Sequence, residues 1–275
     1  MADKMRQPEQ RNQGVTEVGI HAREWIAPAV ALYMINQLVE NNHLYKNLTE
    51  NLEWHIIPLL NPDGYLYSMS EDRMWRKNRA NTSNSECPGV DLNRNFDIFF
   101  GGQGTSQDPC DETYTGSGPF SEPEARALRD YAMSLNHIRL YLTLHSYGQF
   151  EIIIHSRFDV LPHASIGLRD CSIPDGPLHQ QNRAIRNGAI SNLKYDERST
   201  VGSCCRSSRA AAGGSDDWMK GRAGVKYSYT VELPGGGERG FDLPPSRIHP
   251  VSVETWEGLK TMANYIGHER RRRNK

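Results

Sequence analysis

Several stretches of the chain either alternate apolar and polar residues or are apolar throughout, as β-strands are. In residues 138–145 aliphatic side chains alternate with polar ones, and His145 stands at the carboxyl end. Residues 225–232 alternate in the same way and end at Glu232, just before a Leu-Pro-Gly-Gly-Gly break. Residues 52–59 form a nearly continuous apolar run, which is typical of a buried strand. These patterns predict three strands, two of which end at an ionisable residue, His145 or Glu232.

Other stretches repeat apolar residues at the three- and four-residue spacing of an amphipathic helix. One such run opens at Pro28, and another follows Ser252. The sequence Ser-Glu-Pro-Glu at 121–124 has the capping-box pattern and predicts the start of a third helix. A further helical stretch is expected at 178–193. Strands that alternate with helices, without an internal repeat, predict an α/β fold with a mixed, largely parallel central sheet flanked by helices.

The chain has the length and composition of an ordinary globular domain: 275 residues, 37% hydrophobic and 24% charged. We expect a polar leader at 1–14, a single domain at 15–268 and a basic tail at 269–275. The formal net charge of -1 gives no global field that would attract nucleic acid or a membrane surface. No apolar run approaches the roughly 20 residues needed to cross a bilayer. We therefore expect neither a nucleic-acid nor a membrane partner.

The stretch Gly-Ile-His-Ala-Arg-Glu-Trp at 19–25 carries candidate metal-binding chemistry. His21 and Glu24 are three residues apart, between the apolar end of a strand and the helix that opens at Pro28. An imidazole and a carboxylate at this spacing can bind one metal ion from the same turn, and open α/β sheets build their sites at such junctions. Taken alone, this pair does not identify a metal site, because solvated helix faces often carry a histidine and a glutamate at the same spacing.

His145 and Glu232 strengthen the signal, because each ends a predicted strand where a parallel sheet concentrates its chemistry. Two histidines and one glutamate make a three-ligand zinc site with one position left for water. Glu232 is then available to take a proton from that water. The pattern predicts metal-assisted hydrolysis with one Zn²⁺ per chain, bound by His21, Glu24 and His145.

Seven segments then carry a family resemblance, at residues 19–25, 61–64, 73–77, 89–95, 144–147, 213–218 and 229–233. In this order they closely resemble the zinc metallocarboxypeptidases of the pancreatic digestive type, the carboxypeptidase A/B family. The resemblance covers residues 19 to about 266. It implies an exopeptidase that removes the C-terminal residue of peptides or proteins by means of a metal-activated water. It also implies a secreted, monomeric enzyme, although no signal peptide is present in this chain.

The resemblance implies a catalytic role for each matching residue. His21, Glu24 and His145 match the zinc ligands of the family, and Glu232 matches its general base and acid. Arg76 matches the cation that polarises the scissile carbonyl and stabilises the oxyanion.

Further matches concern the substrate. Asn93 and Arg94 match the pair that binds the free C-terminal carboxylate, for which a planar guanidinium suits bidentate contact. Asp91 matches the carboxylate that orients the first zinc histidine. The residues that match the lining of the substrate cleft are Arg23, Arg73, Ser146, Tyr147 and Phe241.

Two positions bear on specificity. Asp216 matches the acidic residue of the carboxypeptidase B branch, which removes Lys or Arg. A buried carboxylate rejects an apolar group because its own desolvation would go uncompensated, so we expect a preference for basic residues. Arg209 stands where the family carries a mobile tyrosine that closes over the substrate. This departure would bring positive charge near a pocket meant for a cation.

The cysteines agree with a secreted enzyme. Cys87 and Cys110 flank the Asn93–Arg94 loop at the separation of the family's disulfide, so the resemblance implies a bridge there. Cys171, Cys204 and Cys205 remain, and their pairing stays open.

Two alternatives accompany this hypothesis. About 20 residues precede His21, fewer than the family's opening strands and helix need, so we expect those first elements to be lacking. Together with Arg209, this favours a catalytically silent relative that keeps the fold for binding. A zinc deacylase of the same broad fold is a second alternative, but it should lack the Asn93–Arg94 pair and the Asp216 pocket.

Overall fold

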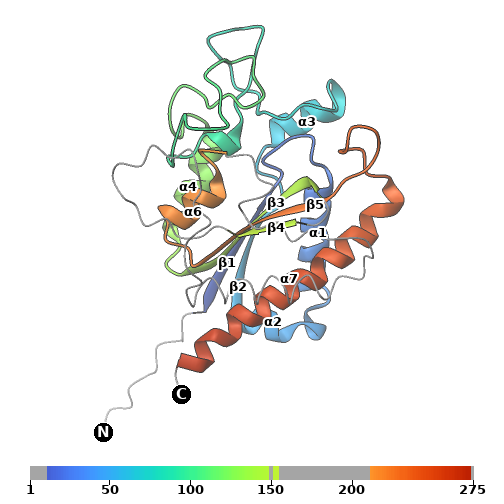
Figure 1. Cartoon of the computed structure of the whole chain (residues 1–275). Coiled ribbons are helices and arrows are strands. Elements are labelled where there is room, and N and C mark those ends of the chain that lie inside the picture. Colours follow the sequence, from blue (N-terminus) through green and yellow to red (C-terminus); the bar gives the residue numbers. More distant parts are fainter. Residues whose placement is uncertain (1–10, 149–150, 155–210, 274–275) are drawn as a thin grey trace.

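The computed structural model describes residues 11–148, 151–154 and 211–273 (Figure 1). The strands are β1 (Asn12–Val18), β2 (Leu52–Ile57), β3 (Ile138–Gly148), β4 (Glu151–Ile154) and β5 (Tyr227–Pro234). The helices are α1 (Ile26–Val39), α2 (Lys46–Asn51), α3 (Pro62–Ser70), α4 (Pro123–Ser134), α6 (Ser215–Gly221) and α7 (Pro245–Arg273), with 3₁₀ turns η1 (Asn42–Leu44) and η2 (Leu92–Arg94). The predicted helix at 178–193, Arg209 and the three remaining cysteines, Cys171, Cys204 and Cys205, lie outside the described residues.

The five strands form one sheet in the order β2-β1-β3-β5-β4. The first four are parallel to one another, and β4 pairs antiparallel with β5. This confirms the predicted α/β fold with a mixed, largely parallel sheet. Because β1, β3 and β5 are neighbours and point the same way, their carboxyl ends meet at one edge of the sheet, where open α/β sheets place their sites.

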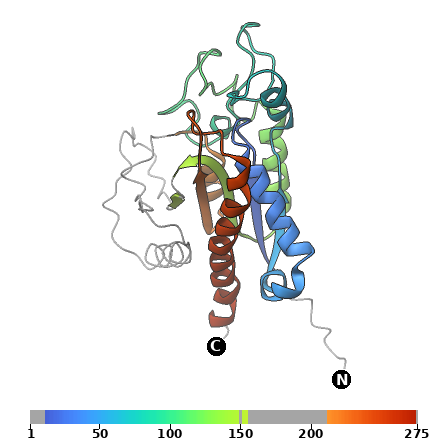
Figure 2. The same ribbon diagram turned by 90° about the vertical axis from the view of Figure 1, so that its right-hand side faces the viewer.

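Helices cover both faces of the sheet (Figure 1). Helices α1, α2 and α7 pack on one face against aliphatic residues of the strands, and Figure 2 shows α7 running alongside α1. Helices α4 and α6 cover the other face together with the turn at η2. The side chains at the centre of this second layer are Val15, Leu92, Phe96, Leu128, Tyr141 and Trp218.

Strand β3 shows why the alternating pattern matters for the site. Leu140, Leu142 and Leu144 point into the core that α1 and α7 cover, as the pattern predicts. The residues between them therefore point to the opposite face, yet Thr143 and His145 are only 0% and 3% exposed. The polar face of β3 is thus buried, and its polar groups need partners within the protein.

The starts of two elements differ from the prediction. Strand β1 begins at Asn12, so residues 12–14 are in the strand rather than in the expected leader. Helix α4 does not use the predicted capping box: its N-cap is Glu122, without a side-chain cap, and the Ser121 hydroxyl donates to the Glu122 carboxylate instead. Pro123, whose fixed φ suits the first helical position, begins the helix.

Helix α7 is longer than the pattern after Ser252 predicts. It begins at Pro245, includes Pro250 and continues to Arg273, through the first part of the expected basic tail. The apolar pattern misses the first turns because they project few side chains into the core. None of the helices in the described part of the chain is both long and apolar enough to span a membrane.

The long connection between α3 and α4 lies over the carboxyl edge of the sheet (Figure 1). The predicted disulfide is confirmed: Cys87 and Cys110 are bonded at an S–S distance of 2.02 Å. The connection is also joined to the segment that leads into α6, because Gly213 exchanges backbone hydrogen bonds with Phe96 and Ile98 at 3.1 and 2.9 Å. Gly213 has a φ of +78°, and a Cβ there would lie 2.3 Å from the carbonyl oxygen of Arg94.

This close approach predicts a stability difference between two glycine variants. Both Gly213→Ala and Gly224→Ala place a side chain at positive φ, which costs about 1–2 kcal/mol, but a Cβ at Gly224 meets no atom within 4 Å. Gly213→Ala must also displace the Arg94 backbone, so we expect it to lower the free energy of unfolding by about 2–4 kcal/mol in total. Chemical denaturation with the disulfide kept oxidised measures both values. Equal losses in the two variants would contradict the close packing at Gly213.

Candidate metal centre and substrate site

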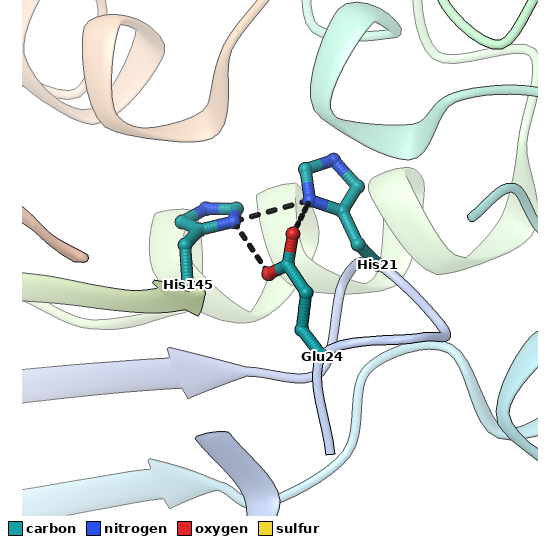
Figure 3. Close-up of side chains that lie close together, drawn as sticks. All are labelled: His21, Glu24 and His145. Atoms are coloured by element: carbon teal, nitrogen blue, oxygen red, sulfur yellow. Dashed lines mark hydrogen bonds and ion pairs between the residues drawn. The ribbon is translucent and has the colours of Figure 1, made fainter. Parts of the chain in front are cut away.

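Three elements bring the predicted metal ligands together (Figure 3). His21 lies in the connection after β1, Glu24 lies two residues before α1 begins, and His145 lies near the carboxyl end of β3. One ligand atom from each residue lies within 4.8 Å of the others, and the side chains are only 3–4% exposed. The sequence spacing therefore predicted the cluster correctly.

The donor atoms face one another at distances that suit a single small cation. His21 Nδ1 lies 2.8 Å from Glu24 Oε1, and His145 Nδ1 lies 3.0 Å from Glu24 Oε2. The two Nδ1 atoms are 3.1 Å apart. Tetrahedral zinc with bonds of about 2.0–2.1 Å to nitrogen separates two ligand atoms by about 3.3 Å. Two imidazoles and one carboxylate at this spacing fit Zn²⁺.

The outer nitrogen of each ring also has a partner, which directs the inner nitrogen toward the centre. His21 Nε2 lies 3.2 Å from Asp91 Oδ1, and His145 Nε2 lies 3.0 Å from Thr143 Oγ1. When Nε2 carries the proton and donates it to these oxygens, Nδ1 keeps its lone pair. Both rings are thus arranged to offer Nδ1 as a ligand.

Asp91 joins the metal centre to Arg76. Its Oδ2 accepts from Arg76 Nε at 3.0 Å and from Nη2 at 2.8 Å, while its Oδ1 faces His21. Burial alone would raise the pKa of Asp91, but the Arg76 guanidinium holds the pKa of that carboxyl well below its usual range. Burial likewise disfavours the charged form of Arg76. The opposite charge of the Asp91 carboxylate and its hydrogen bonds favour that form, and the pKa of Arg76 is raised. Both groups therefore stay charged at this edge of the sheet.

The electrostatics of the three ligands favour a positive charge at their centre. Burial would raise the pKa of Glu24, but His21 and His145 lower it well below its usual value. Burial would lower the pKa of the His145 imidazole, but the Glu24 carboxylate raises it to about 9. A proton and a metal cation compete for the same lone pairs, so lower pH weakens metal binding.

Glu232 lies beside the metal centre on the next strand. It is the register partner of His145 in the parallel pairing of β3 and β5, and it is half-buried. Its charge also favours the charged form of His145, although less than Glu24 does. The prediction that these two strand ends converge is thus confirmed.

The candidate substrate-binding pair lies between η2 and α6. Asn93 Oδ1 accepts from the Ser215 backbone N–H at 2.9 Å, at the start of α6. Arg94 Nη1 donates to the Asn93 carbonyl at 2.8 Å. Burial lowers the pKa of Arg94, while Asp91 opposes that shift. Asp216, in the first turn of α6, is 8% exposed, and its Oδ2 accepts from the Thr230 hydroxyl of β5 at 2.7 Å.

Four of the predicted cleft residues contact one another. Arg73 donates to the backbone carbonyls of Arg23 and Phe241 at 2.8 and 2.7 Å. The Arg23 guanidinium lies 4.5 Å from the centre of the Phe241 ring, a cation–π contact, and the Tyr147 ring packs edge-on against the same ring. Tyr147 is 55% exposed, so this group offers an accessible surface.

Ser146 differs from these four. It is 6% exposed, and its backbone N–H donates to Glu24 Oε2 at 3.2 Å. Ser146 therefore helps to hold the carboxylate of the proposed ligand Glu24 in place. Arg209, predicted at the position of the family's tyrosine, is outside the described residues.

Sequence reasoning missed two residues at the centre, Thr143 and Glu17. Thr143 is two residues before His145 in the alternating stretch, so it lies on the same strand face, and this was the available signal. Glu17 is the ionisable residue in the Val-Thr-Glu-Val-Gly-Ile stretch, and it is 0% exposed. An ionisable residue near the apolar end of a predicted strand is a signal for a functional group.

Comparisons with known proteins agree with this geometry. The family model described as zinc carboxypeptidase matches residues 3–258. Carboxypeptidase B of Astacus astacus is 40% identical over 90% of this chain and 78% of its own length. Carboxypeptidase A2 of Mus musculus is 36% identical over 91% of this chain, which spans only 58% of that protein.

A solved structure shares the fold as well as the sequence. The chain of bovine thrombin-activatable fibrinolysis inhibitor, in complex with tick carboxypeptidase inhibitor, superimposes with a TM-score of 0.79 at 36% identity. The alignment covers 93% of this chain and 82% of that chain. Zinc is the metal that gives the family its name, and the His-Glu-His donor set fits zinc. The chain belongs to the zinc carboxypeptidase family, as its motifs predicted.

Proposed function

We propose that the protein is a zinc-dependent exopeptidase that removes the C-terminal residue of peptides or proteins, with His21, Glu24 and His145 binding one Zn²⁺. The observation that carries this proposal is the convergence of these three buried donors, with the Asp91–Arg76 pair next to them. When bound, zinc supplies a Lewis acid that lowers the pKa of a water ligand.

Glu232 and Arg76 supply the remaining catalytic groups. Glu232 is half-buried beside His145, where its carboxylate can take a proton from the attacking water and give it to the leaving amine. Arg76 is held in its charged form by two hydrogen bonds to Asp91. A fixed cation needs no reorganisation when the negative charge of the oxyanion develops, so it stabilises that charge effectively.

Asn93 and Arg94 explain why cleavage would be confined to the last peptide bond. Both belong to one turn next to α6, and a guanidinium with an adjacent amide can bind a free carboxylate through several hydrogen bonds. An internal peptide bond offers no such carboxylate. The group of Arg23, Arg73, Tyr147 and Phe241, in which Tyr147 is the exposed member, then contacts the residues that precede the cleaved bond.

The proposed preference for C-terminal Lys or Arg depends on Asp216. The relatives do not decide it, because proteins named carboxypeptidase A and B match the chain at similar identity. Asp216 is buried and bonded to Thr230, so it offers a fixed negative charge in a site where water is scarce. A basic side chain would bring an opposite charge to that carboxylate, whereas an aromatic side chain would bring none.

We further propose that the protein acts as a secreted monomer. The Cys87–Cys110 bridge supports secretion, because disulfides persist in oxidising compartments. The alternative of a catalytically silent relative is not favoured, since family membership is accompanied by a full metal donor set and by Glu232 beside it.

The proposed mechanism predicts metal-dependent turnover. Hydrolysis of hippuryl-Arg should stop when a chelator removes zinc and should return when zinc is restored. Glu232→Gln should lower kcat by about 10²–10⁴-fold while zinc remains bound, because only the proton acceptor is lost. Glu238→Gln, an exposed carboxylate in the following loop, is the matched control and should retain wild-type activity. Chelator-insensitive turnover, or full activity of Glu232→Gln, would contradict the mechanism.

The proposed role of Asp216 predicts a preference among substrates. The wild-type protein should hydrolyse hippuryl-Arg with a higher kcat/KM than hippuryl-Phe. Asp216→Asn removes the charge with little change of shape, so it should reduce that ratio by about 10–100-fold, mainly through a higher KM for hippuryl-Arg. The ratio controls for a general loss of folded protein, because both substrates would be affected equally. Faster cleavage of hippuryl-Phe by the wild type would refute the preference.

A further inference from the structure

A buried carboxyl group outside the proposed catalytic set lies behind the metal centre. Glu17 of β1 is the register partner of Thr143 of β3 and is 0% exposed. The Tyr141 hydroxyl donates to Glu17 Oε2 at 3.2 Å. Thr143, directly across from Glu17 on β3, favours the charged form of this carboxyl, and Glu17 Oε1 has no hydrogen-bond partner among the described residues.

Thr143 connects this carboxyl to a metal ligand. Its Oγ1 lies 3.0 Å from His145 Nε2, on the side of the ring away from the metal centre. If His145 binds metal through Nδ1, then Nε2 carries the proton and donates it to Thr143 Oγ1. The hydroxyl proton of Thr143 must then point elsewhere, and the acceptor across from it on β1 is the Glu17 carboxyl, whose Oε1 has no other partner among the described residues.

The two histidines are therefore supported in related ways. The Asp91 carboxylate contacts His21 Nε2 directly, whereas a hydroxyl separates His145 Nε2 from the Glu17 carboxyl. Burying a carboxyl group that lacks a full set of hydrogen bonds costs free energy. The presence of Glu17 inside the sheet therefore suggests that it serves a function. Burial raises the pKa of Glu17 to about 7, and either form of the carboxyl has an oxygen that can accept from Thr143.

We propose that Glu17 is a positioning residue that acts through the Thr143 hydroxyl to fix the ring orientation of His145 and keep its Nδ1 lone pair directed at the metal. The inference rests on the proposed zinc site. It assigns no contact with substrate to either residue.

Four variants test this relay by metal affinity rather than by activity. Thr143→Val removes the hydroxyl at constant shape, and Thr143→Ser keeps it. Glu17→Met removes both acceptor oxygens at similar volume, and Glu17→Gln keeps one. The matched control is Thr16→Val: Thr16 is a fully buried neighbour of Glu17, its side chain faces the other layer, and its hydroxyl has no partner among the described residues.

Zinc affinity is measured by competition with a chelator, and the ligand field is measured from the visible spectrum of the cobalt-substituted protein. Thr143→Val and Glu17→Met should each weaken zinc binding by about 10–100-fold and alter the cobalt bands. Thr143→Ser and Glu17→Gln should stay within about 3-fold of wild type, as should Thr16→Val. Because both residues act along one path, the double variant Thr143→Val/Glu17→Met should lose little more than the weaker-binding single variant.

Several outcomes would overturn the inference. Wild-type affinity and an unchanged cobalt spectrum in Thr143→Val or Glu17→Met would refute the relay while leaving the zinc site intact. An equal loss in Thr16→Val would show that strand packing, and not hydrogen bonding, is responsible. Additive losses in the double variant would show that the two residues act independently. Failure of the wild type to bind zinc would overturn the proposed function together with this inference.

Discussion

The parallel register of β1, β3 and β5 is the constraint on which the rest of the site depends. Parallel neighbours end at the same edge of a sheet, so the segment after β1 reaches His145 of β3, and His145 lies directly beside Glu232 of β5. A one-residue slip of β3 would turn His145 and Thr143 into the aliphatic layer under α1 and α7. The leucines that alternate with them hold the register, because they are buried in that layer.

This arrangement buries polar groups, and a hydrogen-bond network joins most of those at the metal centre. Asp91 joins His21 and Arg76, Glu24 receives the Ser146 N–H, and Thr143 lies between His145 and Glu17. In a low-dielectric environment, each of these contacts is strong when formed and costly when lost. The network therefore keeps the rings and the guanidinium in place before any ligand binds, which is what electrostatic catalysis requires.

Much of the fold and the centre of the site could be predicted from the sequence. Period-two alternation ending in His145 and Glu232 located two strand ends, and the short spacing of His21 and Glu24 located the third component. The sequence could not show the start of β1 at Asn12 or of α7 at Pro245, because these ends contribute little to the core pattern. Local patterns mark Glu17 and Thr143 as polar residues within predicted strands, but they do not show that the two residues pair across β1 and β3.

The most direct test of the central claim is an anomalous difference map at the zinc edge, from crystals of the protein grown with zinc. The account predicts one strong peak per chain, about 2.0–2.2 Å from Nδ1 of His21, Nδ1 of His145 and a carboxylate oxygen of Glu24. A map in which zinc occupies other residues, with no peak among these three, would contradict it.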